Sequence, residues 1–285
     1  MGFRGYRSGW TITTVLFGCV IVVVVVALWS IGQSRQRHNE KFALRAEDMQ
    51  VLPEQPNWIR ENVLRSVVKQ HNLEELFLDD SNLTKQLADA FTLHSWILSV
   101  DSVVKSPTGV EVRVNYRKPV AMVEVRYDDR PHVLPIDAHG TVLPPGDFNR
   151  DDISNYLRIS ADHVRPSGNV GDPWGDAKVV GAAKLAGLLD NIAWKEMGLY
   201  RISVTMDPSD ARVVYYLVLK EYPKIRVLWG SAPGQETAEE EIAPEKITEL
   251  TAFYRANKTL QISSEWTEID LRSRDGSKVV HIEKD

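Results

Sequence analysis

The sequence predicts an α+β protein that follows an N-terminal transmembrane helix. Three observations predict this fold class. An apolar run without any charged residue spans residues 10–31. Apolar residues then recur at helical spacing over 58–70 and 83–94. Most of the remaining chain shows short alternating strand patterns, which two helical patterns at 176–194 and 244–254 interrupt. Many strands with few helices favour a mixed sheet with flanking helices.

The run at residues 10–31 is long enough to cross a bilayer, because about 20 apolar residues in a helix span the ~30 Å hydrocarbon core. Trp10 and Trp29 lie near its ends, where indoles prefer the membrane–water interface. A cleaved signal peptide and a buried helix of a soluble core are the alternatives. The run exceeds a usual signal-peptide core, and only residues 32–34 offer a small-residue cleavage site. We therefore interpret it as an uncleaved signal anchor.

Composition and charge bear on the classes of partner, on disulfide bonding and on the orientation in the membrane. The net charge of −5 gives no reason to expect nucleic acid or an anionic membrane surface. Cys19 is the single cysteine and lies inside the predicted anchor, so no intrachain disulfide can form. Arg4 and Arg7 precede the anchor, and four basic residues follow it closely. That count favours a cytoplasmic C-terminal side, but the rule weakens before a long domain, so charge alone leaves the orientation undecided.

The segments after the anchor predict a spacer and a first globular region. Residues 32–52 are polar and of mixed charge, which predicts a solvated juxtamembrane linker. Residues 53–118 follow the order helix, helix, strand, turn, strand. The second helix has candidate N-caps at 79–82, and we expect His94 at its end with a satisfied ring. Its predicted apolar face consists of Leu83, Leu87, Ala90, Phe91 and His94.

A second region, residues 119–285, is predicted to be rich in strands. Two extended runs surround Asp137-Ala138-His139-Gly140 and predict a hairpin turn. Asp176 caps a helix that we expect to reach about Trp194, with Gly198 just beyond its end. The acidic run at 239–241 is expected on a solvated loop. The predicted strands are 120–125, 157–160, 200–206, 212–219, 224–229, 266–271 and 278–282. The predicted inner face of the helix after Asp176 is Val179, Ala182, Ala183, Ala186, Leu189 and Ile192.

Several blocks, in this order and spacing, resemble the extracytoplasmic part of the FtsQ/DivIB cell-division family. The resemblance covers residues 55–282, behind an anchor in the matching place, and its most specific piece is Ile269-Asp270-Leu271-Arg272. Two departures are visible: only Asp48–Leu52 could supply the family's first POTRA strand, and Ser273 stands where an aromatic residue is usual. The other matching blocks are Ser95-Trp96-Ile97, Gly109–Val114, Lys118-Pro119-Val120-Ala121, Ile136-Asp137, Leu157-Arg158-Ile159, Lys224–Gly230 and Lys246–Tyr254.

The resemblance implies a bitopic scaffold of the bacterial division complex, acting in septum formation. Residues 1–9 would be cytoplasmic, 10–31 the anchor, 32–52 the linker, 53–118 a POTRA-like domain and 119–285 a β-domain outside the cytoplasmic membrane. Other single-pass division proteins would bind the β-domain by adding a strand to its open C-terminal edge. The residues expected to bind them are Tyr254, Trp266, Ser277, Lys278, Val279, Val280, His281 and Ile282.

No catalytic or cofactor motif is stronger than its structural explanation, so we expect no enzyme, cofactor or small-molecule substrate. His132, Asp137 and His139 form a conceivable metal set, but no fourth ligand is evident and Asp137 already serves the turn. No glycine-rich phosphate loop or nucleophile elbow is present. Two alternatives remain: an envelope assembly factor with a POTRA domain that acts outside division, and an envelope hydrolase with an unrecognised site.

Overall fold

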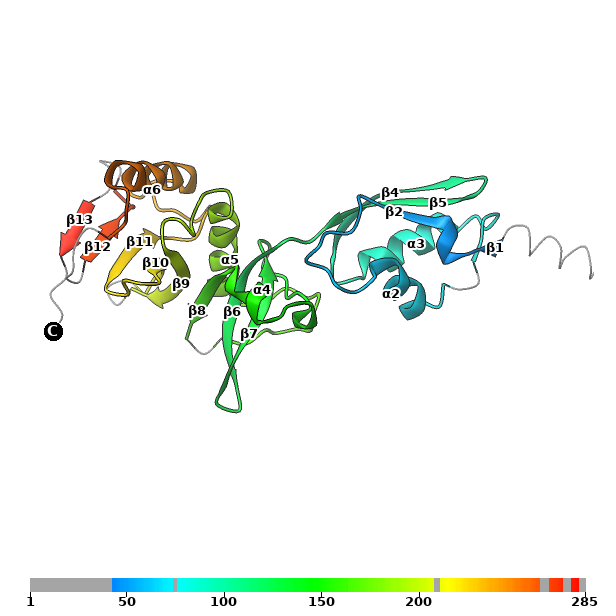
Figure 1. The fold of residues 1–285 in the computed structure, drawn as a ribbon, viewed down its shortest axis with the longest axis horizontal. Helices are drawn as coiled ribbons and strands as arrows, with labels where there is room; N and C mark the ends of the chain where they lie inside the picture. The colour runs from blue at the N-terminus through cyan, green and yellow to red at the C-terminus, as the bar shows by residue number, and fades with distance from the viewer. Residues whose placement is uncertain are drawn as a thin grey trace, which may run out of the picture. The chain divides into compact units, whose positions relative to one another are not determined.

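The computed structural model confirms a mixed α+β architecture with one large mixed sheet (Figure 1). The predicted anchor at 10–31 lies outside the part of the chain that the structure describes. Within that part, no helix combines the length and the apolar character needed to cross a membrane. The described residues are 43–73, 76–162, 164–207, 211–261, 267–273 and 278–281.

Two compact units divide the chain. The second unit consists of Pro53–Val63, Phe91–Asp101 and the chain from Val114 onward. The first contains the described residues before Pro53 together with Leu64–Ala90 and Ser102–Arg113. The sequence predicts one boundary between residues 118 and 119, whereas these units alternate along the chain. They alternate because two long strands, β4 (Ile97–Ser106) and β5 (Gly109–Tyr116), have residues in both units.

A three-stranded sheet has the order β2-β5-β4, and β2 (Met49–Leu52) runs parallel to β5. The end of the expected solvated linker is therefore structured, because residues 49–52 of that segment form strand β2. Gly109 explains the close approach: a Cβ there would lie 2.0 Å from the carbonyl oxygen of Asp48. Before β2 comes the 3₁₀ helix η1 (Ala46–Asp48). The short strand β1 (Ala43–Leu44) pairs antiparallel with β3 (Leu76–Phe77).

Helices α2 (Val63–Gln70) and α3 (Leu83–Thr92) lie along one side of this three-stranded sheet (Figure 1). The predicted apolar face of α3 is confirmed, because all five of its members are buried. His94 follows the helix end as expected, and its ring is engaged. Its Nδ1 accepts a hydrogen bond from the Trp96 N–H at 3.2 Å, and its Nε2 lies 3.3 Å from Glu61 Oε1.

Helix α2 begins at Val63, not near Trp58 as predicted. The side chain of Gln55 explains the difference. Its Oε1 accepts a hydrogen bond from the Val63 N–H at 3.0 Å, and its Nε2 donates to the carbonyl oxygens of Ile59 and Glu61 at 3.0 and 2.7 Å. One amide thus satisfies backbone groups over the preceding segment and holds it outside the helix.

The eight-stranded sheet has the order β13-β12-β11-β10-β9-β8-β6-β7. The pairs β6–β8, β8–β9 and β11–β12 are parallel, and the other neighbours are antiparallel, so the sheet is mixed as predicted. Its strands are β6 (Pro119–Tyr127), β7 (Arg130–Asp137), β8 (Leu157–Ala161), β9 (Leu199–Met206), β10 (Val213–Leu219), β11 (Ile225–Gly230), β12 (Thr267–Asp270) and β13 (Lys278–His281).

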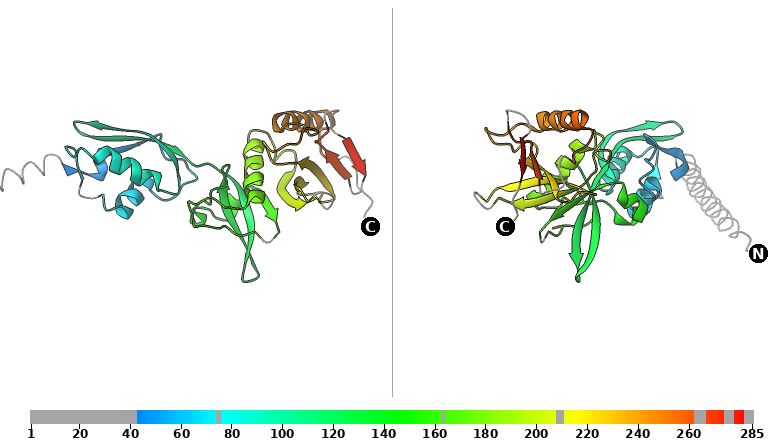
Figure 2. Two further views of the ribbon diagram at one scale, coloured as in Figure 1. Left: turned by 180° about the vertical axis from the view of Figure 1, so that it is seen from behind. Right: turned by 60° about the vertical axis from the view of Figure 1, so that its left-hand side comes forward.

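Helix α5 (Ala177–Leu189) packs on β6, β8 and β9 (Figure 2). Asp176 is its N-cap, and the first five residues of its predicted inner face are fully buried. The prediction of its end is wrong, because the helix stops at Leu189 and does not reach Trp194. Asn191 Nδ2 donates to the Gly187 carbonyl oxygen at 3.2 Å and so satisfies a terminal helix group. Gly198 consequently ends the following turns and does not cap the helix.

Two further helical segments flank the large sheet. The stretch predicted as turn-rich contains the 3₁₀ helix η2 (Pro145–Asp147) and the short helix α4 (Arg150–Ser154). Helix α6 (Ala243–Asn257) has a proline in its first turn, as predicted, and buries Leu250 in the core. Figure 1 shows α6 beside β11 and β12, at the end of the sheet that β13 closes.

Candidate partner-binding edge

Strand β13 forms one edge of the eight-stranded sheet. It pairs antiparallel with β12, so that Val279 opposes Ile269 and Val280 opposes Glu268. In the described part of the chain, no strand lies on its other side. An edge strand of this kind presents main-chain N–H and C=O groups that a further strand can bond. The strand predicted at 278–282 is thus found over its described residues, 278–281, at the edge of the sheet.

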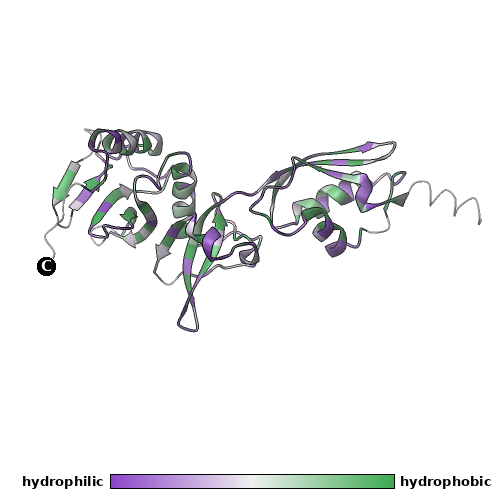
Figure 3. Ribbon diagram, viewed as in Figure 1, coloured by the Kyte–Doolittle hydropathy of each residue, from purple (hydrophilic) through white to green (hydrophobic). Residues whose placement is uncertain are grey.

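The two described side chains of β13, those of Val279 and Val280, are apolar and exposed. Val279 is 44% exposed and Val280 is 47% exposed. Figure 3 shows the strand in the hydrophobic colour at the end of the sheet. Exposed β-branched residues on an edge favour pairing with another chain, because added backbone bonds would also cover apolar surface. This edge can therefore accept an extended segment.

The most specific block of the sequence forms the support under that edge. Ile269 and Leu271 are fully buried, whereas Asp270 and Arg272 point outward and bind each other. Arg272 Nε donates to Asp270 Oδ1 at 3.0 Å, and Nη2 donates to Oδ2 at 2.9 Å. The hydrogen bond to Asp270 raises the pKa of Arg272. The two-bond geometry fixes the direction of the chain as it leaves β12.

Helix α6 is fixed to this end of the sheet by a buried ion pair. Lys246 is fully buried, and its Nζ donates to Glu240 Oε1 at 2.6 Å and to the Trp229 carbonyl oxygen at 2.8 Å. The same Nζ lies 5.2 Å from the centroid of the Trp229 ring. The expectation that the run 239–241 is solvated is therefore wrong for Glu240, which is only 5% exposed.

Gly230 makes room for this ion pair at the end of β11. Its φ of +90° is in the left-handed region, and a Cβ there would lie 1.8 Å from Glu240 Oε1. The same oxygen accepts a hydrogen bond from the Ser231 N–H at 2.7 Å. Burial alone would raise the pKa of Glu240, but the hydrogen bonds from Lys246 and Ser231 outweigh it and lower the pKa. Glu240 is therefore held as a carboxylate.

The outer face beside the edge carries a second charged arrangement. Arg226 Nε donates to Glu268 Oε2 at 2.8 Å across β11 and β12, and its guanidinium lies 4.4 Å from the Tyr216 ring centroid. Both side chains of the ion pair are partly exposed, so this contact stabilises the strand pair only modestly. Side-chain contacts therefore connect β12 to β11 through Arg226 and Glu268, and they connect β11 to α6 through Lys246.

The other predicted binding residues are not all brought to this edge. Tyr254 packs partly against the core, and its hydroxyl donates to the Glu196 carbonyl oxygen at 3.1 Å, in the segment that follows α5. Lys278 and His281 contribute their backbone to β13. Trp266, Ser277 and Ile282 lie outside the described residues.

The structure gives no metal arrangement to the three residues that were considered for one. His132 and Asp137 lie near opposite ends of β7, about 17 Å apart at a strand's ~3.4 Å rise per residue. Asp137 instead serves the turn: Oδ1 accepts from the His139 and Thr141 N–H groups, and Oδ2 accepts from Arg117 Nη1 at 2.7 Å. Among all described residues, no cluster of three or more potential metal ligands occurs.

Sequence reasoning missed the buried role of Lys246 and Glu240, although one signal was present. Lys246 occupies a position between Ala243, Ile247 and Leu250 on the inner face of α6. A lysine on an apolar helix face indicates a buried cation that needs a carboxylate.

No protein-family model matches the chain, and no curated protein matches it either.

Proposed function

We propose that this chain is a bitopic membrane scaffold of the bacterial cell-division complex, as its resemblance to the FtsQ/DivIB family implies. Its role is to recruit or couple single-pass partner proteins at the division site, and we assign it no catalytic step. The observation that carries the proposal is the terminal strand β13, an exposed apolar edge next to the Ile269-Asp270-Leu271-Arg272 block. The partner segment adds a strand to this edge.

Strand addition explains how a flat edge gains both affinity and selectivity. Main-chain hydrogen bonds to β13 contribute about 0.5–1.5 kcal/mol each, independent of the partner's side chains. The exposed side chains of Val279 and Val280 select which apolar residues fit. The buried Lys246–Glu240 pair already fixes the neighbouring helix α6, so any ordering on binding is confined to the β12–β13 hairpin.

The proposal includes a topology. The anchor at residues 10–31 crosses the cytoplasmic membrane, residues 1–9 stay inside, and the globular part lies in the periplasm or at the cell exterior. Protease added to cells with a permeabilised outer layer should digest the globular part. If the globular part survives until the cytoplasmic membrane is lysed, this orientation is wrong.

Paired substitutions at the same position test the edge. Val279→Pro and Val280→Pro each remove one main-chain donor, whereas Val279→Thr and Val280→Thr keep it. Along β13, successive N–H groups point alternately to β12 and to the open side, so only one of the two positions bonds the partner. At least one proline variant should therefore lose the partner while its threonine counterpart retains it. Co-purification of partner membrane proteins with the full-length chain is the readout, and circular dichroism confirms folding. Wild-type recovery of partners with both folded proline variants would place the binding edge elsewhere.

A further inference from the structure

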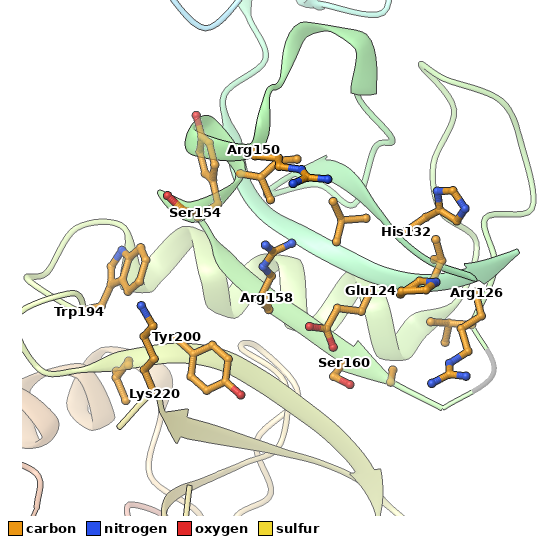
Figure 4. Close-up of a pocket in the computed structure, with 18 of the residues that line it drawn as sticks. Glu124, Arg126, His132, Arg150, Ser154, Arg158, Ser160, Trp194, Tyr200 and Lys220 are labelled. Carbon is orange, nitrogen blue, oxygen red and sulfur yellow. The ribbon is translucent and has the colours of Figure 1, made fainter. Parts of the chain in front are cut away.

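A groove of about 1510 Å3 lies over β6, β8 and β9, on the face of the large sheet opposite α5 (Figure 4). The alternate residues Val123, Ile159 and Ile202 point to α5 and are fully buried. Glu124, Arg158 and Ser160 point the other way and line the groove. This surface is separate from the β13 edge, because β9, β10, β11 and β12 lie between β8 and β13 in the sheet.

The groove is basic, although the chain as a whole has a net charge of −5. Its three carboxylates are Glu124, Asp162 and Glu221. The lysine and arginine side chains that line it are Arg126, Arg150, Arg158, Arg165, Lys195 and Lys220. Cations therefore outnumber carboxylates two to one (6 against 3). Figure 4 shows Arg126 at one end of the groove, Lys220 at the other and Arg158 between them.

Arg158 is the central cation of the groove, and in the described part of the chain no carboxylate forms a direct ion pair with it, although Glu124 attracts it from nearby. The nearby Glu124 is engaged elsewhere, because its Oε1 accepts from Arg201 Nη2 at 3.2 Å. Burial lowers the pKa of Arg158, Glu124 opposes that shift and the neighbouring Arg201 adds to it. A half-buried guanidinium beside a second one is stabilised by any carboxylate that reaches both of its N–H edges.

The walls of the groove are apolar and aromatic. Ile153 and Tyr156 come from the α4 segment, and Trp194, Leu199 and Tyr200 come from the segment that leads into β9. Figure 4 shows Trp194 and Tyr200 beside Lys220. Apolar walls around a cationic floor fit a ligand that combines carboxylates with apolar groups.

We propose that this groove binds an acidic peptide segment of a partner protein. One carboxylate of the segment pairs with Arg158 on the floor, others pair with Arg126 and Arg150 on the rim, and apolar side chains contact Tyr156 and Trp194. The concave floor is out of reach of a flat bilayer surface. The three carboxylates of the lining interrupt its cations, which does not suit the evenly spaced phosphates of a nucleic acid, whereas a peptide can place apolar residues between its carboxylates.

A selection experiment with matched variants tests this proposal. The full-length chain in nonionic detergent is used to select binders from a phage-displayed library of random peptides. Selected peptides should be enriched in Asp and Glu together with apolar residues. Their affinity should fall on the order of 10-fold or more in Arg126→Glu/Arg150→Glu and in Arg158→Gln, and should weaken with rising salt. Lys69→Glu/Lys184→Glu makes the same net charge change on exposed helix positions outside the groove and should bind as the wild type does.

The outcomes separate the groove from its competitors. Peptides without acidic enrichment overturn the proposal, as does equal binding by the two double variants. Vesicles with anionic lipid form a parallel arm. If they bind in a manner that depends on Arg126 and Arg150 while no acidic peptide is selected, the groove recognises lipid headgroups and the proposal is wrong. Since Val279→Pro and Val280→Pro leave the groove intact, its failure is distinguishable from failure at the β13 edge.

Discussion

The two edges of the large sheet are built in opposite ways. At one end, β7 carries Pro131 and Pro135, which have no N–H to offer a further strand. Arg130 and His132 on the same strand are exposed and polar. The turn after β7 also returns beside it, since the Leu143 N–H donates to the Pro135 carbonyl oxygen at 2.9 Å. At the other end, β13 presents Val279 and Val280 to solvent.

The contrast indicates where another chain can pair with this sheet. Proline, charge and a covering segment are common ways of blocking an edge, and β7 has all three. Of the described residues, β13 has two exposed valines and no proline. A protein that protects one edge and leaves the other apolar is suited to strand addition at a single place, because among the described strands of this sheet only the β13 edge is open.

The largest expected effect comes from breaking the support behind the open edge. Lys246→Ala leaves the buried carboxylate of Glu240 without its cation, which should cost about 3–5 kcal/mol in the free energy of unfolding. Urea unfolding followed by tryptophan fluorescence measures it. Lys184→Ala, on the exposed side of α5, is the matched control and should change stability by less than about 0.5 kcal/mol.

The double variant Lys246→Met/Glu240→Gln sharpens that test. It removes both charges while keeping a side-chain oxygen for the Ser231 N–H, so it should recover much of the lost stability. Methionine also keeps the volume of the lysine stem. A double variant as unstable as Lys246→Ala would therefore mean that the hydrogen bonds of the ammonium to Glu240 and to the Trp229 carbonyl oxygen, and not relief of an unpaired buried charge, hold α6 in place.

A smaller effect is expected from opening the protected edge. Arg130→Val/Pro131→Val gives β7 the apolar, donor-bearing character of β13 and should produce concentration-dependent self-association. Each intermolecular main-chain bond would add about 0.5–1.5 kcal/mol. Sedimentation velocity measures the association state. Arg130→Asp/Pro131→Val restores the donor but keeps a charge, so it should remain as the wild type. Self-association of both variants alike would show that charge does not protect this edge.

The smallest effect is a pH dependence at the support of the open edge. The folded-state pKa of Glu240 lies below its ordinary value of 4.5, so its contribution to stability is present above that value and is lost as pH falls through the folded pKa. Glu240→Gln keeps the acceptor oxygen and removes the titration. The loss of stability between pH ~6 and pH ~3 should therefore be smaller in Glu240→Gln than in the wild type, by urea unfolding. Identical losses would assign the acid sensitivity to other carboxylates.

Local periodicity predicted most of the secondary structure, including the strand that forms the open edge. The buried faces of α3 and α5 follow from apolar residues at helical spacing, and the strand at 278–281 follows from its short run of β-branched residues. The misplaced start of α2 and end of α5 have another origin: Gln55 and Asn191 bond backbone groups that the helix pattern leaves to solvent. Periodicity does not register such side-chain bonds.

Contacts between residues far apart in the chain could not be predicted from local patterns. β2 packs beside β5 only because Gly109 admits the Asp48 carbonyl, a contact between residues far apart in the chain. Glu240 stands in an acidic run that composition assigns to solvent, yet the left-handed Gly230 opens a place for it. The basic groove likewise gathers residues from α4, β6, β8 and the end of β10, and no short motif contains them.

The parallel pairing of β11 with β12 has a consequence for the order of folding. Parallel neighbours need a crossover, and here α6 supplies it, so β12 can dock only after that helix has closed a long loop over the sheet. The hairpin of β12 and β13 should therefore be among the last parts to assemble and among the first to open, which hydrogen exchange can follow. A partner strand that binds only the docked hairpin would stabilise it by mass action, so that recognition also completes the fold.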